Sequence, residues 1–318
     1  MALFKKIFLI CIIITTPKLS EALETDDFYA LTKPLPDSRG AINGYVNNVI
    51  DKHVAWANKK RLAVSCDKIT FRIAASFLSN FRGPVNFLER RGLLYPDTES
   101  RGEVHEDSIY RDIPILKSQS RHIRIGQVVF GEDKFEHFFG LGFLHYVKYR
   151  KIFKKLLRKD FSKEQARREA IKRSLPFSIY SENTFVGLWP SGIFSFADIE
   201  SNIASIPFYD EICRENPILK KKGKKWFRVR SFDFVHYIHP FWNEAINMNY
   251  YAPKVWPKVK PYLLEHCERM SEIKNSVTWK YSEKVKHLSL SEDLLSELPG
   301  KLPKRRAKSF VDFCAGIK

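Results

Sequence analysis

The sequence predicts a mainly α-helical fold, a single globular helical domain with a few short β-strands and long irregular loops. Apolar residues recur at three- and four-residue spacing in several stretches, which is typical of amphipathic helices. Strand-like runs are few and short, near residues 123–130 and 224–234. The chain has 318 residues and is 44% hydrophobic, which suffices for a packed core and argues against wholesale disorder.

The first 22 residues have the pattern of a secretory signal peptide. Two lysines precede an apolar run at 7–14, and Ser20 and Ala22 provide small residues before a cleavage point. The run is shorter than the roughly 20 residues needed to span a bilayer, which favours cleavage over an anchor. We therefore expect an exported protein, periplasmic or secreted, either free or membrane-associated. The domain would then occupy 23–288, followed by a polar and basic tail at 289–318.

Four cysteines follow the signal pattern, and none belongs to a CxxC pair. An even number in an exported chain permits two disulfides with three possible connectivities. The alternative is that some are buried thiols. The four residues are Cys66, Cys213, Cys267 and Cys314.

The net charge of +18 and a pI near 9.6 indicate an anionic partner. For an exported protein these partners are peptidoglycan or another anionic envelope polymer, or phospholipid headgroups. The sequence has no zinc-finger or RNA-recognition signature, so we expect no nucleic acid.

The first half of the domain is predicted to hold two helices and a long loop. Apolar residues at helical spacing predict a helix from residue 41 to 56, and a second, shorter one covers 66–81. Residues 83–120 are rich in charge, proline and glycine, which predicts a structured loop. Its consecutive His-Glu-Asp triplet at 105–107 is interpreted as solvated rather than metal-binding.

A strand at 123–130 leads into a helical, aromatic stretch from Phe135, which continues as a very basic segment. Twelve lysines and arginines lie between residues 148 and 173, interleaved with apolar side chains. Ser162 with Gln165 predicts a new helix start, and so a helical hairpin. Such a basic amphipathic hairpin can make peripheral contact with an anionic membrane, although a solvated helix face gives the same pattern.

The second half is predicted to contain further helices and one basic turn. A helix at 197–209 would be capped near Ser195 and ended by Pro207, and another would cover 259–274. Residues 220–230 form a basic turn or surface hairpin. The tail is expected to be loosely packed unless Cys314 pins it by a disulfide.

The candidate site is predicted within residues 131–202, where polar residues occur within an otherwise apolar and aromatic sequence. Asp133 and His137 are four apart, so their side chains share a helix face and can meet. The carboxylate would then raise the basicity of the imidazole, or the pair would ligate a metal. The alternative is a buried pair that only ties helices together.

A second group of polar residues follows the basic segment. Glu182 precedes a turn punctuated by glycine and proline, and Ser195 stands three before Asp198, as in a helix cap. Asn202 is four after Asp198 and on the same face. Capping accounts for Ser195 but not for Glu182 or Asn202.

These motifs resemble the signature of the VanZ-like superfamily, including its YfiM-like exported members, over roughly residues 131–205. The matching elements are Asp133-Lys134 with His137-Phe138, then Glu182, then Ser195, Asp198 and Asn202. The resemblance implies a cell-envelope protein. One departure is Ser205, where the family usually has glycine, and another is the lack of membrane-embedding segments.

Three functions remain open. The first is a glycosidase-type hydrolase of peptidoglycan glycan strands, without a cofactor, in which apolar surroundings raise the pKa of Glu182 so that it acts as general acid. The second is a non-enzymatic VanZ-like envelope protein that binds anionic lipid or cell wall, with the polar cluster as a structural network. The third is a metallohydrolase using Asp133, His137 and Glu182. For the first, the catalytic residues would be Glu182, Asp198, Asp133 and His137, and the substrate-binding residues Glu136, Ser195, Asn202, Trp189 and Tyr180.

Overall fold

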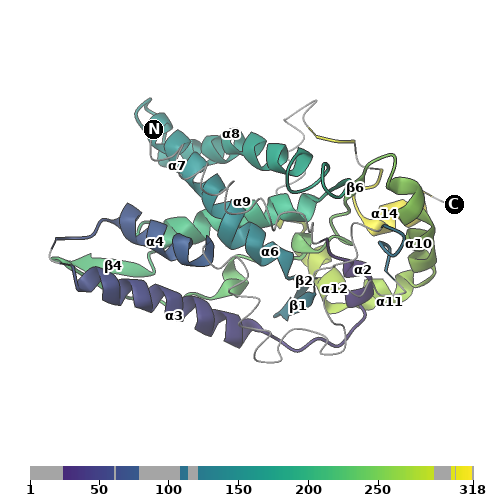
Figure 1. Ribbon diagram of the computed structural model, residues 1–318, viewed down its shortest axis with the longest axis horizontal. Coiled ribbons are helices and arrows are strands. Elements are labelled where there is room, and N and C mark those ends of the chain that lie inside the picture. Colours follow the sequence, from purple (N-terminus) through teal and green to yellow (C-terminus); the bar gives the residue numbers. More distant parts are fainter. Residues whose placement is uncertain are drawn as a thin grey trace.

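The computed structural model describes residues 24–60, 62–78, 108–113, 121–289, 302–304 and 306–316. Within these ranges the protein is mainly helical with short strand pairs, which confirms the predicted fold class (Figure 1). The expected signal peptide and the His-Glu-Asp triplet at 105–107 lie outside the described residues. Among the described residues, no helix combines the length and apolar character that crossing a membrane requires.

The two predicted N-terminal helices are present and form one side of the molecule (Figure 1). Helix α3 (Arg39–Asn58) buries Ile42, Val46 and Ile50 at its three- and four-residue spacing, and α4 (Cys66–Leu78) packs against it. The basic hairpin of β4 (Leu219–Lys222) and β5 (Lys225–Arg228) also lies along α3.

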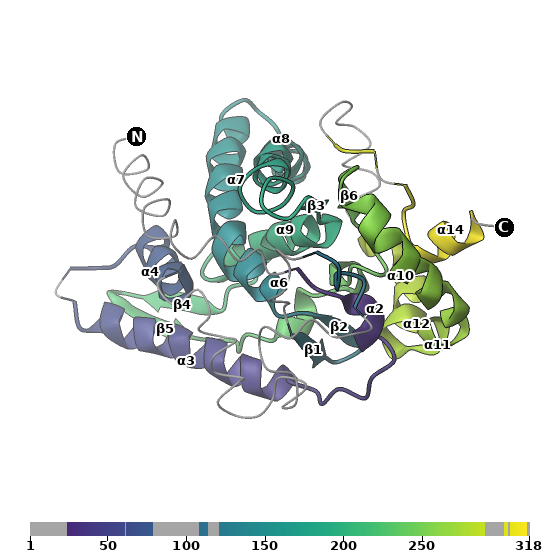
Figure 2. The same ribbon diagram turned by 45° about the vertical axis from the view of Figure 1, so that its right-hand side comes forward.

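A three-helix layer carries most of the candidate site. The hairpin of β1 (His122–Ile125) and β2 (Val128–Gly131) feeds α6 (Asp133–Glu136), the π-helical turn η2 (His137–Leu141) and α7 (Gly142–Leu157). The chain then reverses into α8 (Lys163–Asn183) and crosses to α9 (Phe196–Glu211). Figures 1 and 2 both show α7 beside α8, with α9 beneath them. The predicted helical hairpin is therefore confirmed.

Local sequence signals start α8 and α9 where predicted. Ser162 forms a capping box, since its side chain accepts from Gln165 N and the Gln165 side chain accepts from Ser162 N. Ser195 caps α9 by accepting from Asp198 N at 3.2 Å. Both caps satisfy backbone donors that a helix start otherwise leaves unpaired.

The predicted end of α9 at Pro207 is wrong, because the helix continues through this proline to Glu211. Proline removes one backbone hydrogen bond, at a cost of about 3 kcal/mol in a helix interior. The following turn buries Phe208 and Tyr209 completely, and the Tyr209 hydroxyl donates to Phe139 O at 2.6 Å. Tertiary packing of these two rings therefore overrides the local signal.

Aromatic side chains make the core between these layers. The ring of Phe138 lies within 6 Å of the rings of Phe139, Phe208, Phe234 and Trp242. All five are at most 2% exposed. These aromatic side chains therefore pack in the core and are not available to stack on a sugar at the surface.

The remaining structure is a set of short elements, most of them from the C-terminal part of the chain. It comprises α2 (Asp27–Ala30), the pair β3 (Ile193–Phe194) and β6 (Tyr250–Tyr251), the 3-10 turns η3 (Phe234–His236), η4 (Pro240–Trp242) and η5 (Lys286–Leu288), and the helices α10 (Trp256–Glu268), α11 (Met270–Asn275), α12 (Val277–Lys284) and α14 (Phe310–Ala315). The single helix expected at 259–274 is instead α10 and α11, separated at Arg269. This break lets both Leu263 and Ile273 reach the core.

Two disulfides resolve the open connectivity. Cys66–Cys213 joins α4 to the segment after α9, and Cys267–Cys314 joins α10 to α14. The second bond pins the described end of the tail, where Phe310 is fully buried. The pinned alternative for the tail therefore holds for residues 306–316.

Candidate functional site

The Lys134 ammonium is the centre of a buried charge cluster. Its Nζ lies 2.6 Å from Asp133 Oδ2, 2.6 Å from Asp198 Oδ1 and 2.7 Å from Glu244 Oε1. The side chain is 0% exposed. Burial alone lowers the pKa of Lys134, but the three carboxylates outweigh burial and hold it well above its ordinary value. Lys134 is therefore a permanent cation inside the protein.

Asp198 joins this cation to an imidazole. Its Oδ1 faces Lys134, and its Oδ2 lies 3.1 Å from His137 Nε2. Burial alone lowers the pKa of His137, whereas Asp198 raises it above the ordinary value. Burial favours the neutral form of Asp198, but His137 and Lys134 hold its pKa below the usual range. Asp198 is thus ionised, and it favours the charged form of His137.

Glu182 approaches the same cluster from the end of α8. Its Oε2 accepts from Ser195 N at 3.4 Å, and its Oε1 has no hydrogen-bond partner. A Cβ at Gly187 would lie 2.7 Å from Oε2, so this turn accepts only glycine without displacement. Burial, then the negative charges of Asp198 and Glu24, raise the pKa of Glu182 well above its ordinary value. The pKa of Glu182 is therefore raised as expected, and the causes are burial and the neighbouring carboxylates.

Five of the nine predicted site residues meet in this cluster, and the other four lie around it. Those that meet are Asp133, His137, Glu182, Ser195 and Asp198. Asn202 lies one turn beyond Asp198, 1% exposed, with both amide atoms unpartnered. Glu136 is partly exposed, and Tyr180 and Trp189 are 61% and 74% exposed. These two aromatic side chains are therefore largely in solvent, whereas Glu182 is buried.

Sequence reasoning missed Glu244 and the acids near the N-terminus. Glu244 accepts from Ser195 Oγ at 3.1 Å and from Asn249 Nδ2 at 2.6 Å, and its own N donates to Asp27 Oδ2. Burial raises its pKa to about 8, against the opposing effect of Lys134. Glu24 is also buried beside these acids, and burial raises its pKa. The sequence did contain a signal for Glu244, because it is an acidic residue within the aromatic-rich segment 232–251. The same kind of signal predicted the site at 131–202.

A second candidate surface lies at the turn between α7 and α8, hereafter the hairpin tip (Figure 1). Its basic residues recur at three- and four-residue spacing along α7 and into the turn that follows it, so those on the helix share a face. None of them has an ion-pair partner in the part of the chain that the structure describes, and two apolar side chains beside them, Leu157 and Phe161, are 42% and 37% exposed. The basic residues of the hairpin tip are Lys148, Lys151, Lys155, Arg158 and Lys159.

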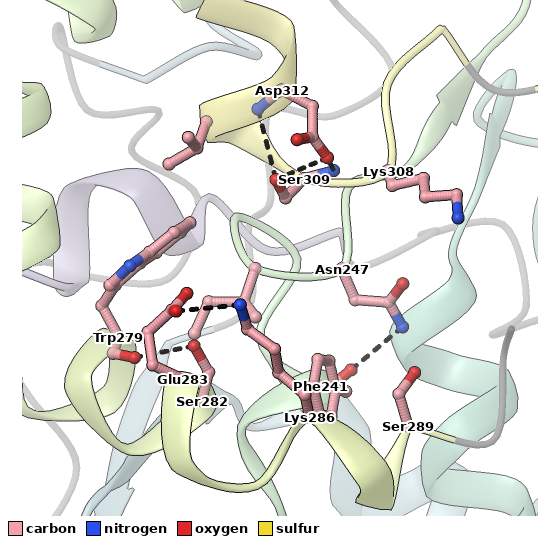
Figure 3. Close-up of a pocket in the computed structure, with 12 residues that line it drawn as sticks. Phe241, Asn247, Trp279, Ser282, Glu283, Lys286, Ser289, Lys308, Ser309 and Asp312 are labelled. Carbon is pink, nitrogen blue, oxygen red and sulfur yellow. Dashed lines mark hydrogen bonds and ion pairs between the residues drawn. The ribbon is translucent and has the colours of Figure 1, made fainter.

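A pocket of about 330 Å³ lies away from the charge cluster, between α12 and α14 (Figure 3). Its charged groups are already paired, since Lys286 contacts Glu283 at 2.9 Å and Asp312 accepts from Ser309 Oγ at 2.9 Å. Asn247 donates to Phe241 O at 3.2 Å. Lys286, Glu283, Ser309, Asp312 and Asn247 therefore already have partners within the protein.

Comparison with protein-family models, curated proteins and solved structures finds no match to the chain. The VanZ-like resemblance of residues 131–205 therefore rests on its motif residues alone.

Proposed function

We propose that the protein is a non-enzymatic, exported envelope protein that binds an anionic lipid surface through the hairpin tip. The charge cluster around Lys134 is then its structural network. The observation that carries the proposal is the row of exposed basic side chains beside Leu157 and Phe161, which have no ion-pair partner among the described residues.

The structural role of the cluster follows from what it connects. Thr25 Oγ1 donates to Asp133 Oδ1 at 2.8 Å, which ties the N-terminal segment to α6. Lys134 joins α6 to Asp198 on α9 and to Glu244 after η4. Glu182 is 1% exposed, so a glycan oxygen cannot reach its carboxyl without a change in the surrounding packing. Such a network fixes how separate segments meet.

The basic side chains of the hairpin tip are exposed, unlike the buried charges of the cluster. A basic side chain close to an anionic membrane contributes about 1 kcal/mol of attraction. Five such residues therefore provide on the order of 5 kcal/mol, enough for reversible peripheral binding. Leu157 and Phe161 add apolar surface that can enter the interfacial region. These apolar side chains favour a lipid surface over a soluble anionic polymer.

Sedimentation with vesicles tests the proposal. The oxidised protein should bind vesicles containing phosphatidylglycerol and not vesicles of phosphatidylcholine alone. Reversing Lys151, Lys155 and Lys159 to glutamate should weaken binding by at least about 100-fold, since each charge contributes about 1 kcal/mol. The control reverses Lys258, Lys260 and Lys274, which are exposed on α10 and α11 and give the same net charge. Equal loss in both triple variants would refute a specific role for the tip.

A second candidate partner is a peptidoglycan glycan strand. Tyr180, Phe185 and Trp189 are all exposed, and the rings of Tyr180 and Phe185 lie 6.4 Å apart. Exposed aromatic faces of this kind suit stacking on sugar rings. Trp189→Ala should then reduce co-sedimentation with purified sacculi, while Phe227→Ala, another exposed aromatic, should not. Release of glycan fragments that is lost in Glu182→Gln would instead support hydrolysis.

A further inference from the structure

Three polar side chains at the edge of the charge cluster have the arrangement of a cation site. Asp133 and His137 lie one turn apart across α6 and η2, and Asp198 lies in the first turn of α9. One ligand atom from each lies within 4.8 Å of the other two. Their side chains are 7–12% exposed, whereas Lys134 is 0% exposed, so they form the solvent side of the cluster.

The spacing fits a transition metal. Ligand atoms bound at about 2.1 Å lie about 3.0–3.4 Å from one another in octahedral or tetrahedral geometry. His137 Nε2 and Asp198 Oδ2 are already 3.1 Å apart. The remaining separations, at most 4.8 Å, close with small side-chain rotations. Two carboxylates and one imidazole form a mixed oxygen and nitrogen set suited to zinc or manganese.

Carboxyl groups outnumber the lysines in the cluster. Six residues with carboxyl side chains are each at most 6% exposed here when the whole residue is counted, and the one lysine among them is Lys134. Buried charges are stable when they are paired or coordinate a metal. Lys134 holds Asp198 Oδ1, so a metal beside Oδ2 would complement this lysine rather than replace it. The six groups are Glu24, Asp27, Asp133, Glu182, Asp198 and Glu244.

Unpartnered buried atoms provide an independent observation. Glu182 Oε1 has no hydrogen-bond partner, although its other oxygen is held by Ser195 N, the residue that also caps Asp198 N. Ser195 therefore links the Glu182 carboxyl to the first turn of α9, and Glu182 Oε1 has no hydrogen-bond partner among the described residues. Asn202, on the Asp198 face of α9, also has both amide atoms free. Metal ligands and the waters bound to a metal are commonly held by such neighbouring polar groups.

We propose that Asp133, His137 and Asp198 bind one divalent transition-metal ion of the zinc or manganese class, with Glu182 as the neighbouring acceptor for a metal-bound water. This ligand set uses Asp198 where the metal hypothesis from sequence used Glu182. The ion stabilises the fold by linking α6, η2 and α9 through its three ligands, and its binding does not depend on recognition of lipid.

Metal titration of the EDTA-treated, oxidised protein tests the site. Zn²⁺ or Mn²⁺ should bind with one ion per chain by calorimetry and raise the melting temperature by about 5 °C at a hundredfold excess over Kd. His137→Gln and Asp198→Asn should each weaken binding at least tenfold. His236→Gln is the matched control, because His236 is an exposed histidine outside the cluster.

A spectroscopic measurement on the unaltered protein covers the case in which a variant fails to fold. Electron paramagnetic resonance of bound Cu²⁺ should show coupling to one imidazole nitrogen. The inference is overturned if neither metal shifts the melting temperature, if no imidazole coupling appears, or if His236→Gln removes binding as fully as His137→Gln.

Discussion

Lysines in two regions of this protein have opposite surroundings. Lys134 is fully buried and contacts three carboxylates within 2.7 Å, whereas the lysines of the hairpin tip are exposed and have no ion-pair partner in the described chain. Taking an ammonium out of water costs several kcal/mol, so the buried lysine must form ion pairs within the protein that offset this cost. An exposed lysine bears no such cost, so its charge remains available to a partner.

This contrast separates stability from binding within one continuous stretch of chain. Residues 131–205 contain both regions, joined by α7 and α8. The polar residues that stand out among apolar ones in the sequence form the structural charge cluster. The run of lysines and arginines forms the hairpin tip, which is the proposed binding region. The predictions below test whether the two roles are separate, from the largest expected effect to the smallest.

Replacing Lys134 with methionine should cost about 3–5 kcal/mol of unfolding free energy, because it leaves buried carboxylates without their cation. Urea denaturation measures the loss. Lys148→Met, at an exposed lysine of the tip, should change stability by no more than about 0.5 kcal/mol. Equal, small losses in both variants would contradict the structural role of the cluster.

Stability should fall as pH rises from about 5 to about 8 in the presence of EDTA. Burial raises the pKa of Glu244 to about 8, so the folded state holds a proton that the unfolded state releases near its ordinary pKa. The folded form then binds more protons, and unfolding free energy decreases by up to about 1.4 kcal/mol per pH unit for each such group. The raised pKa of His137 acts in the same direction above its unfolded value.

Denaturation at several pH values provides the measurement. Glu244→Gln cannot ionise, so it should make this dependence less steep, while Glu283→Gln, at an exposed acid, should leave it unchanged. Stability that rises over this interval in the unaltered protein would count against the buried, protonated carboxyls.

Salt should separate the two regions without any mutation. Raising ionic strength from about 0.05 M to about 0.5 M shortens the screening length severalfold, which should weaken vesicle binding by the tip by at least tenfold. The ion pairs of Lys134 are buried and are screened much less. Sedimentation and denaturation at both salt concentrations measure the two quantities, and salt-independent vesicle binding would argue for apolar attachment.

Ser162→Ala should produce the smallest effect, a loss of about 1 kcal/mol, because it removes the capping box of α8. Ser162→Asp keeps a good capping residue and should stay close to the unaltered protein. Denaturation of both variants measures the difference. A loss as large as that of Lys134→Met would mean that the hairpin tip is as structural as the cluster.

Sequence reasoning recovered the features that depend on neighbouring residues. The apolar stripe of α3 and the capping residues Ser162 and Ser195 are local, so spacing alone located them. The continuation of α9 through Pro207 was missed, because the buried rings that stabilise it pack against distant parts of the chain. Local signals compete with tertiary packing, and here packing prevailed.

Only part of the candidate site could be predicted, because sequence spacing reveals contacts within a short motif and not between distant segments. Asp133, His137 and Asp198 carry a short motif and do meet. Glu244 is 110 positions from Lys134 in the chain, and no local pattern links them. The pairing of Cys66 with Cys213, 147 positions apart, likewise required the fold.

One crossed measurement tests the division of roles most directly. Unfolding free energy and vesicle binding are measured for Lys134→Met and for the triple reversal of Lys151, Lys155 and Lys159 to glutamate. The account predicts that the first variant loses stability yet binds vesicles under conditions where it is folded, and that the second keeps its stability and loses binding. If both variants lose both properties, or if the triple reversal binds as well as the unaltered protein, the division of roles is wrong.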